Sequence, residues 1–303
     1  MNTQTISTLG YEFDVPLAAM GLPSQGPVRL LGEILGDRIT LPQGHVRDIL
    51  DHAGTHGTRF GDAAVALGYA TADQVLQALS TQFQSPCTTL RPQIDSADLV
   101  LLTQPHSAQA EALRGIRGQV VRRMGRAAGR RRTLAVVSPE PGDGKTFLVA
   151  NLGVALAQTG ARTLIVDADM RGPRMQEIFK LHGRHGLSSA LIGRADGQVV
   201  HSVAAVPGLY VLPCGITPPN PLELIECAAF RSLMENLPQH FEHVLVDTPA
   251  IAYGADAIAI ADRCRASLLV GRRNRSGMAA LRHVAGELDQ DPDGFVGMIV
   301  NDF

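Results

Sequence analysis

A lysine and a threonine, Lys145-Thr146, end a glycine-rich turn in the stretch LAVVSPEPGDGKTFLVAN, residues 134–151. An apolar run precedes the turn and an apolar-periodic segment follows it, so we expect a strand, a loop and a helix. Backbone N–H groups of such a loop surround phosphate oxygens, the lysine reaches the β- and γ-phosphates, and the threonine hydroxyl holds Mg²⁺. The pattern therefore predicts a nucleotide-binding site with Mg²⁺, with these residues: Gly142, Asp143, Gly144, Lys145, Thr146 and Phe147.

One position departs from the usual G-x-x-x-x-G-K-[ST] pattern, because Pro139 stands where the first glycine belongs. The alternative is a glycine-rich turn whose lysine is merely solvated. The expected strand before the turn and the helix after it favour the nucleotide site.

Three aspartates directly follow apolar runs that we interpret as strands: Asp167, Asp169 and Asp247. Ligands of open α/β sheets bind beyond the carboxyl ends of the strands, so these acids should face the glycine-rich loop. A single aspartate at a strand end is more often a helix cap. Together with Thr146 they predict an Mg²⁺ site, and a carboxylate close to a hydroxyl nucleophile can accept its proton.

Strands and helices alternate around these residues, which predicts a mostly parallel sheet flanked by helices, an α/β fold of the phosphate-loop type. The expected strands are 134–137, 163–166, 210–213, 244–246, 267–270 and 296–300. The expected helices are 107–124, 151–158, 222–236 and 278–289.

These segments resemble the bacterial tyrosine kinases, the cytoplasmic kinases of capsule and exopolysaccharide export. The resemblance rests on LIVDADMRGP (164–173), GLSSALIG (186–193), LYVLPCGITPPNPLELI (209–225) and FEHVLVDTP (241–249). It implies that Lys145 and Thr146 bind ATP and Mg²⁺, that Asp167 and Asp169 bind metal and activate the attacking tyrosine hydroxyl, and that Asp247 holds the metal through water. Catalysis would then be mostly positioning and neutralisation of charge.

The resemblance also extends to partners. Glu111, Arg114 and Arg117 lie at i, i+3 and i+6 of the expected helix and are similar to the family's self-association motif, although an ordinary solvated face is the alternative. The nearest type of kinase works with a membrane chain-length determinant protein that regulates polymerisation and export. We therefore expect a homo-oligomer in the cytoplasm, recruited to the inner face of the membrane by that partner.

One feature of these kinases is missing from this sequence. They usually end in a tyrosine cluster, whereas this chain ends Val300-Asn301-Asp302-Phe303, so phosphorylation of such a tail is excluded and the acceptor must lie elsewhere. One alternative is an ATP-binding or hydrolysing regulator without kinase activity. A second is a partition-type ATPase, which we rank lower because Glu140 stands where that class places a second lysine.

The part of the chain before the kinase-like region divides into three segments. Residues 1–27 read as a flexible arm, 28–90 as a small helical domain and 91–106 as a proline-containing linker before the domain at 107–303. The helical segment resembles a duplicated domain at the N-terminus of type II secretion and pilus ATPases. Some of those domains bind cyclic di-GMP, which the resemblance would place at Arg59, Gly61, Gly68 and Gln82. Because Leu30 replaces the arginine of the other half, a docking module is the alternative.

Composition limits the classes of function. The 303 residues carry a formal net charge of −2, which gives no general attraction to nucleic acid, and the basic run 126–132 contains no aromatic residues. Charges interrupt every apolar run before it reaches the ~20 residues of a membrane-spanning helix. The four cysteines lack metal-site spacing and fit a reducing compartment.

Overall fold

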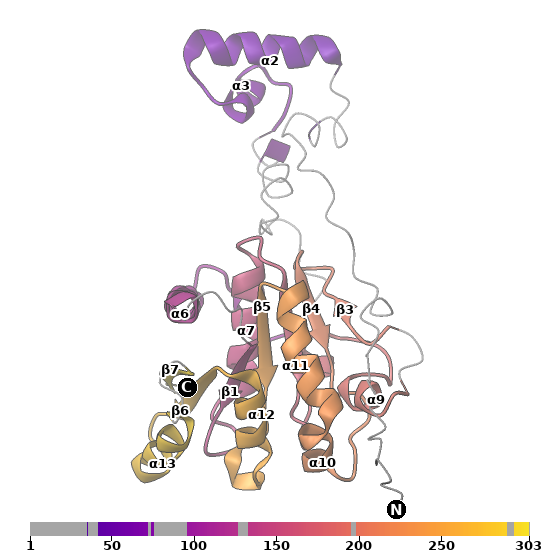
Figure 1. The fold of residues 1–303 in the computed structure, drawn as a ribbon. Coiled ribbons are helices and arrows are strands. Elements are labelled where there is room, and N and C mark those ends of the chain that lie inside the picture. Colours follow the sequence, from indigo (N-terminus) through magenta and orange to yellow (C-terminus); the bar gives the residue numbers. More distant parts are fainter. Residues whose placement is uncertain are drawn as a thin grey trace, which may run out of the picture.

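The computed structural model describes residues 35, 42–71, 74–75, 96–126, 133–194, 198–289 and 294–302. From residue 133 onward the described chain forms a seven-stranded sheet in the order β3-β4-β2-β5-β1-β6-β7, parallel except for β3 (Figure 1). The strands are β1 (Thr133–Val137), β2 (Thr163–Asp167), β3 (His201–Ser202), β4 (Leu209–Leu212), β5 (His243–Asp247), β6 (Ser267–Arg272) and β7 (Phe295–Asn301). The predicted α/β fold is confirmed, and β3 is a short strand that the sequence did not predict.

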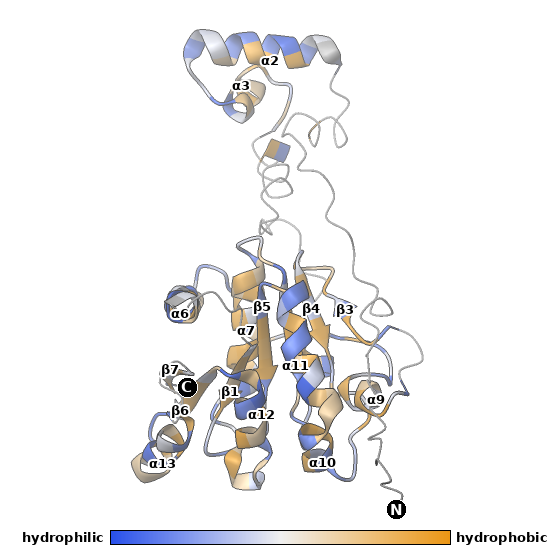
Figure 2. Cartoon of the chain, viewed as in Figure 1, coloured by the Kyte–Doolittle hydropathy of each residue, from blue (hydrophilic) through white to orange (hydrophobic). Residues whose placement is uncertain are grey.

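The central strands are apolar along their whole length and are buried on both faces. Alternate residues enter two separate cores, so that Leu134 and Val136 of β1 pack in one core and Ala135 and Val137 pack in the other. Figure 2 shows the hydrophobic colouring of these strands. A sheet covered on both faces needs such continuous apolar runs, which explains why the sequence predicted the central strands within one or two residues.

Helix α7 (Lys145–Ala157) is buried on almost all sides, from Leu148 to Ala157 without interruption. A helix with no polar face needs cover on its outer side as well. Two helices supply it, α5 (Val100–Thr103) and α6 (Ala108–Arg126), and both contact α7.

The predicted linker at 91–106 is therefore wrong for its second half, because Leu99, Val100 and Leu101 are buried against α7. The fully buried Asn151 fixes this segment: its side-chain amide donates to the carbonyl oxygen of Asp98 over 2.6 Å. Its amide oxygen accepts from the N–H of Leu101 over 3.4 Å. Pro105, the one proline of this segment among the described residues, follows α5 and does not prevent this packing.

The opposite face of the sheet is covered by α11 (Ala228–His240), α12 (Asp256–Cys264) and α13 (Met278–Leu288). The single helix predicted over 222–236 is instead two, α10 (Pro221–Glu226) and α11, because Cys227 adopts an extended conformation between them. Helix α12 was not predicted. Shorter elements are α8 (Met175–Ile178), α9 (Leu187–Leu191) and the 3₁₀ turn η2 (Ile251–Tyr253). Within the described ranges, no helix is long and apolar enough to cross a membrane.

The N-terminal region contributes α2 (Gln43–His56) and α3 (Phe60–Ala66), which share a small core containing Ile49 and Ala63. Within the predicted helical domain at 28–90, α2 ends at His56, where Gly57 follows in a left-handed conformation. The predicted arm at 1–27 and most of the predicted helix that contains Gln82 lie outside the described residues.

Candidate active site

The order of the strands brings three functional segments to one edge of the sheet. Strands β2, β5 and β1 are consecutive neighbours, and their carboxyl ends lead into Asp167, Asp247 and the glycine-rich loop. Asp167 pairs in register with Asp247, and Asp247 pairs with Val136 of β1. Because parallel strands end at the same edge, the acids and the loop meet there as the sequence predicted.

The two signature side chains of the loop point back to the strand ends. Lys145 is the first residue of α7, and its Nζ donates to the Ser138 hydroxyl over 2.9 Å. The Thr146 hydroxyl donates to Oδ2 of Asp247 over 2.7 Å. Burial lowers the pKa of Lys145, although the carboxylates of Asp247 and Asp169 oppose this effect. The ammonium and the hydroxyl are thus held beside the carboxyl ends of β1 and β5.

Asp167 and Asp247 each keep one carboxylate oxygen unsatisfied. Both side chains are fully buried. Oδ2 of Asp167 accepts from the Met175 N–H over 3.0 Å, whereas Oδ1 of either aspartate has no hydrogen-bond partner among the described residues. Burial, helped by the neighbouring carboxylate, raises the pKa of Asp167, and burial raises the pKa of Asp247 to about 7. Two buried, unpartnered oxygens of this kind fit a cation that takes a few oxygen ligands from the protein and the rest from phosphate and water.

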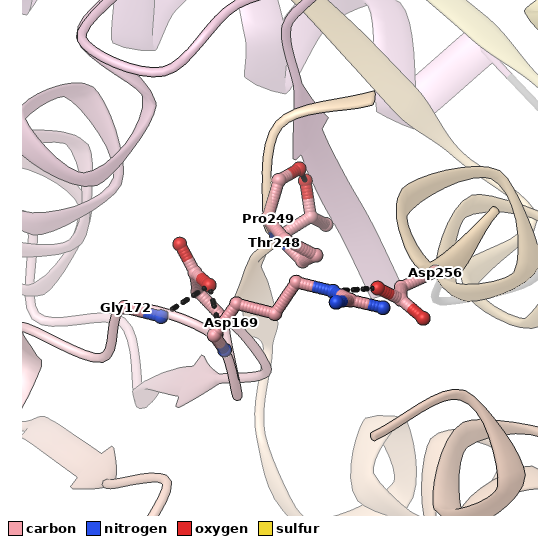
Figure 3. A network of polar contacts seen from close by, with 6 residues as sticks. Asp169, Gly172, Thr248, Pro249 and Asp256 are labelled. Carbon is pink, nitrogen blue, oxygen red and sulfur yellow. Dashed lines mark hydrogen bonds and ion pairs between the residues drawn. The ribbon is translucent and has the colours of Figure 1, made fainter. Parts of the chain in front are cut away.

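Asp169 differs from these two acids because it is anchored to its own loop. Its Oδ1 accepts hydrogen bonds from the backbone N–H of Arg171 over 3.1 Å and of Gly172 over 2.9 Å (Figure 3). Its side chain keeps some exposure, 9%, where Asp167 and Asp247 have none. The carboxylate is therefore fixed through one oxygen, and the residue is less deeply buried than Asp167 and Asp247.

Asp143 has a structural contact network that its place in the motif did not reveal. Its fully buried carboxylate accepts from the Glu140 N–H over 3.0 Å and from the Ser276 hydroxyl over 2.8 Å. The side chain of Asp143 thus fixes the loop. Phe147, the third residue of α7, packs its partly buried side chain against the core.

Residues distant in the sequence hold the loop from its other side. Asn301 donates from its side-chain amide to the carbonyl oxygen of Asp143 over 3.0 Å. Arg272 and Arg275 donate to the carbonyl oxygens of Gly142 and Pro141 over 3.3 and 3.1 Å. Sequence reasoning missed these residues and Ser138, because a side chain that bonds a backbone carbonyl leaves no spacing signal.

Glycine is required at two loop positions. Gly142 and Gly144 have φ angles of +82° and +103°, which side chains disfavour. A Cβ at Gly144 would also lie 2.2 Å from Nδ2 of Asn301. The loop can therefore follow this path only with glycine at both positions.

The predicted oligomerisation residues lie on α6 and contact groups of their own chain. Glu111 and Arg114 form an ion pair, and Arg114 also donates to the Pro105 carbonyl over 2.8 Å. Arg117 donates to the Ala155 carbonyl of α7 over 3.1 Å. Glu111 is the more exposed member of this ion pair, with 68% of its side chain accessible against 28% for Arg114.

Of the predicted cyclic di-GMP residues, three are described. Arg59 precedes α3 and is exposed, Gly61 is buried within that helix, and Gly68 follows it with a φ of +71°. Gln82 lies outside the described residues.

A phosphate-binding loop beside strand-end carboxylates on a parallel sheet defines a nucleotide-binding domain, and a family model agrees. The model of the CobQ/CobB/MinD/ParA nucleotide binding domain matches residues 134–303. That match covers more than half of the chain, so the chain belongs to this family.

Comparison with individual proteins narrows the family. The tyrosine-protein kinase CpsD of Streptococcus agalactiae is 35% identical over 169 residues, 55% of this chain and 73% of that protein. Among solved structures, the chimerical protein CapA2B2 matches with a TM-score of 0.62 and 30% identity, covering 74% of this chain and 97% of that one. The kinase domain of the Escherichia coli tyrosine kinase ETK matches with a TM-score of 0.63 and 28% identity, covering 67% and 79%. The chain belongs to the bacterial tyrosine kinases and is an enzyme of that class.

Proposed function

We propose that this chain transfers the γ-phosphate of ATP to tyrosine hydroxyls, with Mg²⁺ held by Thr146, Asp167 and Asp247. The observation that carries the proposal is the pair of buried, unpartnered Oδ1 atoms of Asp167 and Asp247 beside Lys145 and Thr146. Mg²⁺ held by these residues would supply positive charge that offsets the negative charge of the phosphates. Mg²⁺ prefers oxygen ligands, and the two carboxylates and the hydroxyl provide them.

The remaining residues position the reactants. N–H groups of the loop and the Lys145 ammonium bind the β- and γ-phosphates, where the start of α7 adds its dipole. We assign Asp169 to the attacking phenol, since it is the least buried of the three acids. The phenol oxygen bonds to the γ-phosphorus, the bond from phosphorus to the β,γ-bridging oxygen breaks, and the phenol proton passes to Asp169. ADP leaves with the bridging oxygen.

The biological setting is also a proposal. The similarity to kinases of capsule and exopolysaccharide export supports action beside a membrane chain-length determinant protein, which would recruit this chain to the inner face of the membrane. We also propose self-association through the α6 residues Glu111, Arg114 and Arg117. For the N-terminal helices we propose a docking role, with cyclic di-GMP binding as the alternative; calorimetry with that ligand separates the two.

The test is phosphate transfer by the purified chain. The chain, Mg²⁺, γ-labelled ATP and a glutamate–tyrosine copolymer are incubated with and without the partner's cytoplasmic tail, and phosphotyrosine is separated from free phosphate. Lys145→Met should abolish labelling of tyrosine. Lys180→Met is the matched control, because Lys180 is exposed and lies outside the site. Label that appears only as free phosphate would overturn the kinase proposal in favour of a regulatory ATPase.

A further inference from the structure

An ion pair links the loop after β2 to the first turn of α12. Nε of Arg171 donates to Oδ2 of Asp256, and Figure 3 labels Asp256 at the end of the dashed line that marks this contact. Arg171 follows Asp169 by two residues, and its backbone N–H is one of the two that bind Oδ1 of Asp169. The same residue therefore contacts Asp169 through its backbone and Asp256 through its side chain.

The two ends of this ion pair have different environments. Only 2% of the Asp256 side chain is exposed, against 37% of the Arg171 side chain. In the part of the chain that the structure describes, Oδ1 of Asp256 has no hydrogen-bond partner. A carboxylate buried at the start of a helix gains from the helix dipole, but it still needs a cation to offset its desolvation. Arg171 supplies that cation, so the buried carboxylate restrains the arginine to one position.

That restraint reaches the site. If the Arg171 side chain is held on α12, its N–H and the neighbouring N–H of Gly172 stay directed at Oδ1 of Asp169. Asp169 then presents its other oxygen in one orientation. Displacement of a reacting group by about 1 Å costs up to about a hundredfold in rate, so the orientation of this carboxylate has a direct kinetic effect.

We propose that Asp256 is a positioning residue, which orients Asp169 for the phosphate acceptor by holding Arg171 on α12. The proposal deepens the proposed function and rests on it, because it assumes that Asp169 faces the acceptor hydroxyl. Asp256 itself touches neither nucleotide nor acceptor. Sequence reasoning could not find it, since α12 was not predicted and Asp256 stands nine residues after Asp247 with no motif of its own.

The same loop provides a matched control. Arg174 pairs with Asp98 over 3.1 Å, and it too joins this loop to another element. The Arg174 side chain is 50% exposed and the Asp98 side chain 35%. Among the hydrogen bonds and ion pairs of the described residues, neither side chain contacts Asp169. An exposed ion pair of this kind contributes little to stability, so Arg174→Ala removes a similar pair without the proposed consequence.

The experiment compares Asp256→Asn, Arg171→Ala, the double variant and Arg174→Ala with the unchanged full chain. Three quantities are measured: kcat and KM for the tyrosine copolymer, the affinity for ADP, and hydrogen exchange of the peptide covering 168–176. We expect Asp256→Asn and Arg171→Ala each to lower kcat by about ten- to a hundredfold, with ADP affinity within about twofold. Exchange in 168–176 should become faster, exchange in 137–146 should not change, and Arg174→Ala should leave kcat unchanged.

The double variant tests whether the two side chains act as one unit. Its loss of kcat should equal that of either single variant, because the second substitution removes nothing further. Losses of kcat that add in the double variant would overturn the positioning role. A loss of kcat that is explained by a lowered melting temperature alone would also overturn it. If the unchanged chain labels no tyrosine, the proposed function fails, whereas unaltered exchange at 168–176 in Asp256→Asn would overturn this inference by itself.

Discussion

At the scale of single residues, Asp167 and Asp247 are two buried carboxyl groups whose pKa values are raised by burial. The pKa of Asp247 rises from 3.8 to about 7 because burial disfavours its charge. The folded, metal-free chain therefore binds this proton more tightly than the unfolded chain does. By linkage, its free energy of unfolding falls as the pH rises from about 4 to about 7, and the loss is complete above that range.

Asp247→Asn removes that ionisation and should stabilise the metal-free chain at pH 8 while it abolishes transfer. We expect a melting temperature a few degrees higher than that of the unchanged chain at pH 8, with the difference shrinking towards pH 5. Thermal scans across this pH range, with and without Mg²⁺, measure it. Asp262→Asn on the exposed side of α12 is the control. An equal gain at pH 5 and pH 8 would contradict the assignment of this pKa.

Asn301 offers a second prediction, on the binding loop itself. Asn301→Ala removes the donor to the Asp143 carbonyl, which costs about 1–2 kcal/mol for a buried group, so Mg-ADP should bind about tenfold more weakly. Calorimetric titration with Mg-ADP measures the change. The exposed neighbour Asp302, which forms an ion pair with Arg273, provides Asp302→Ala as the control. Equal affinities for both variants would rule out a role of Asn301 in shaping the loop.

The candidate site was only partly readable from the sequence at this scale. Lys145, Thr146 and the strand-end acids could be predicted because a motif and the ends of apolar runs mark them. Three other residues could not be predicted. Ser276 and Asn301 bond loop residues more than a hundred positions away, which only the fold brings near. Ser138 lies close in sequence, but a serine is too common a residue to mark a site. Asp143 was predicted as a ligand, but its side chain fixes the loop.

At the scale of elements, α5 and α6 show why a composition-based boundary failed. Prolines between residues 86 and 105 suggested a linker, yet α7 is apolar on its outer side and needs a cover. The strands could be predicted because burial on both faces demands continuous apolar residues. Helix α12 was missed because its polar exposed face shortens its apolar stretch, and α10 and α11 were merged because an extended residue has no sequence signature.

Two fragments test this boundary. A fragment of 107–303 lacks Leu99, Val100 and Leu101, whereas a fragment of 96–303 keeps them. Burial of three such side chains stabilises by about 3–5 kcal/mol once an already compact unfolded state is allowed for. We expect the shorter fragment to melt well below the longer one, as measured by thermal circular dichroism. Equal melting temperatures would show that α7 does not need this cover.

At the scale of the whole molecule, α6 serves both its own fold and the proposed contact between copies. Arg117 bonds α7 within the chain, so its removal affects stability as well as association. Glu111 is exposed, so its substitution tests association between copies with little effect on stability. We expect Glu111→Arg to shift sedimentation towards smaller species without lowering the melting temperature. Arg122→Glu, on the exposed side of the same helix, should do neither, and identical sedimentation of the two variants would remove Glu111 from the contact.

The side chains that hold the loop from β6 and β7 have one more consequence. They bond its carbonyls from outside the loop and so restrain its backbone, and a restrained loop loses less conformational entropy when a ligand binds. Thermodynamic reciprocity then works in the other direction as well. A bound nucleotide should reduce the opening of the last strand, so that protection of β7 amides reports occupancy of a pocket formed more than 150 residues earlier in the chain.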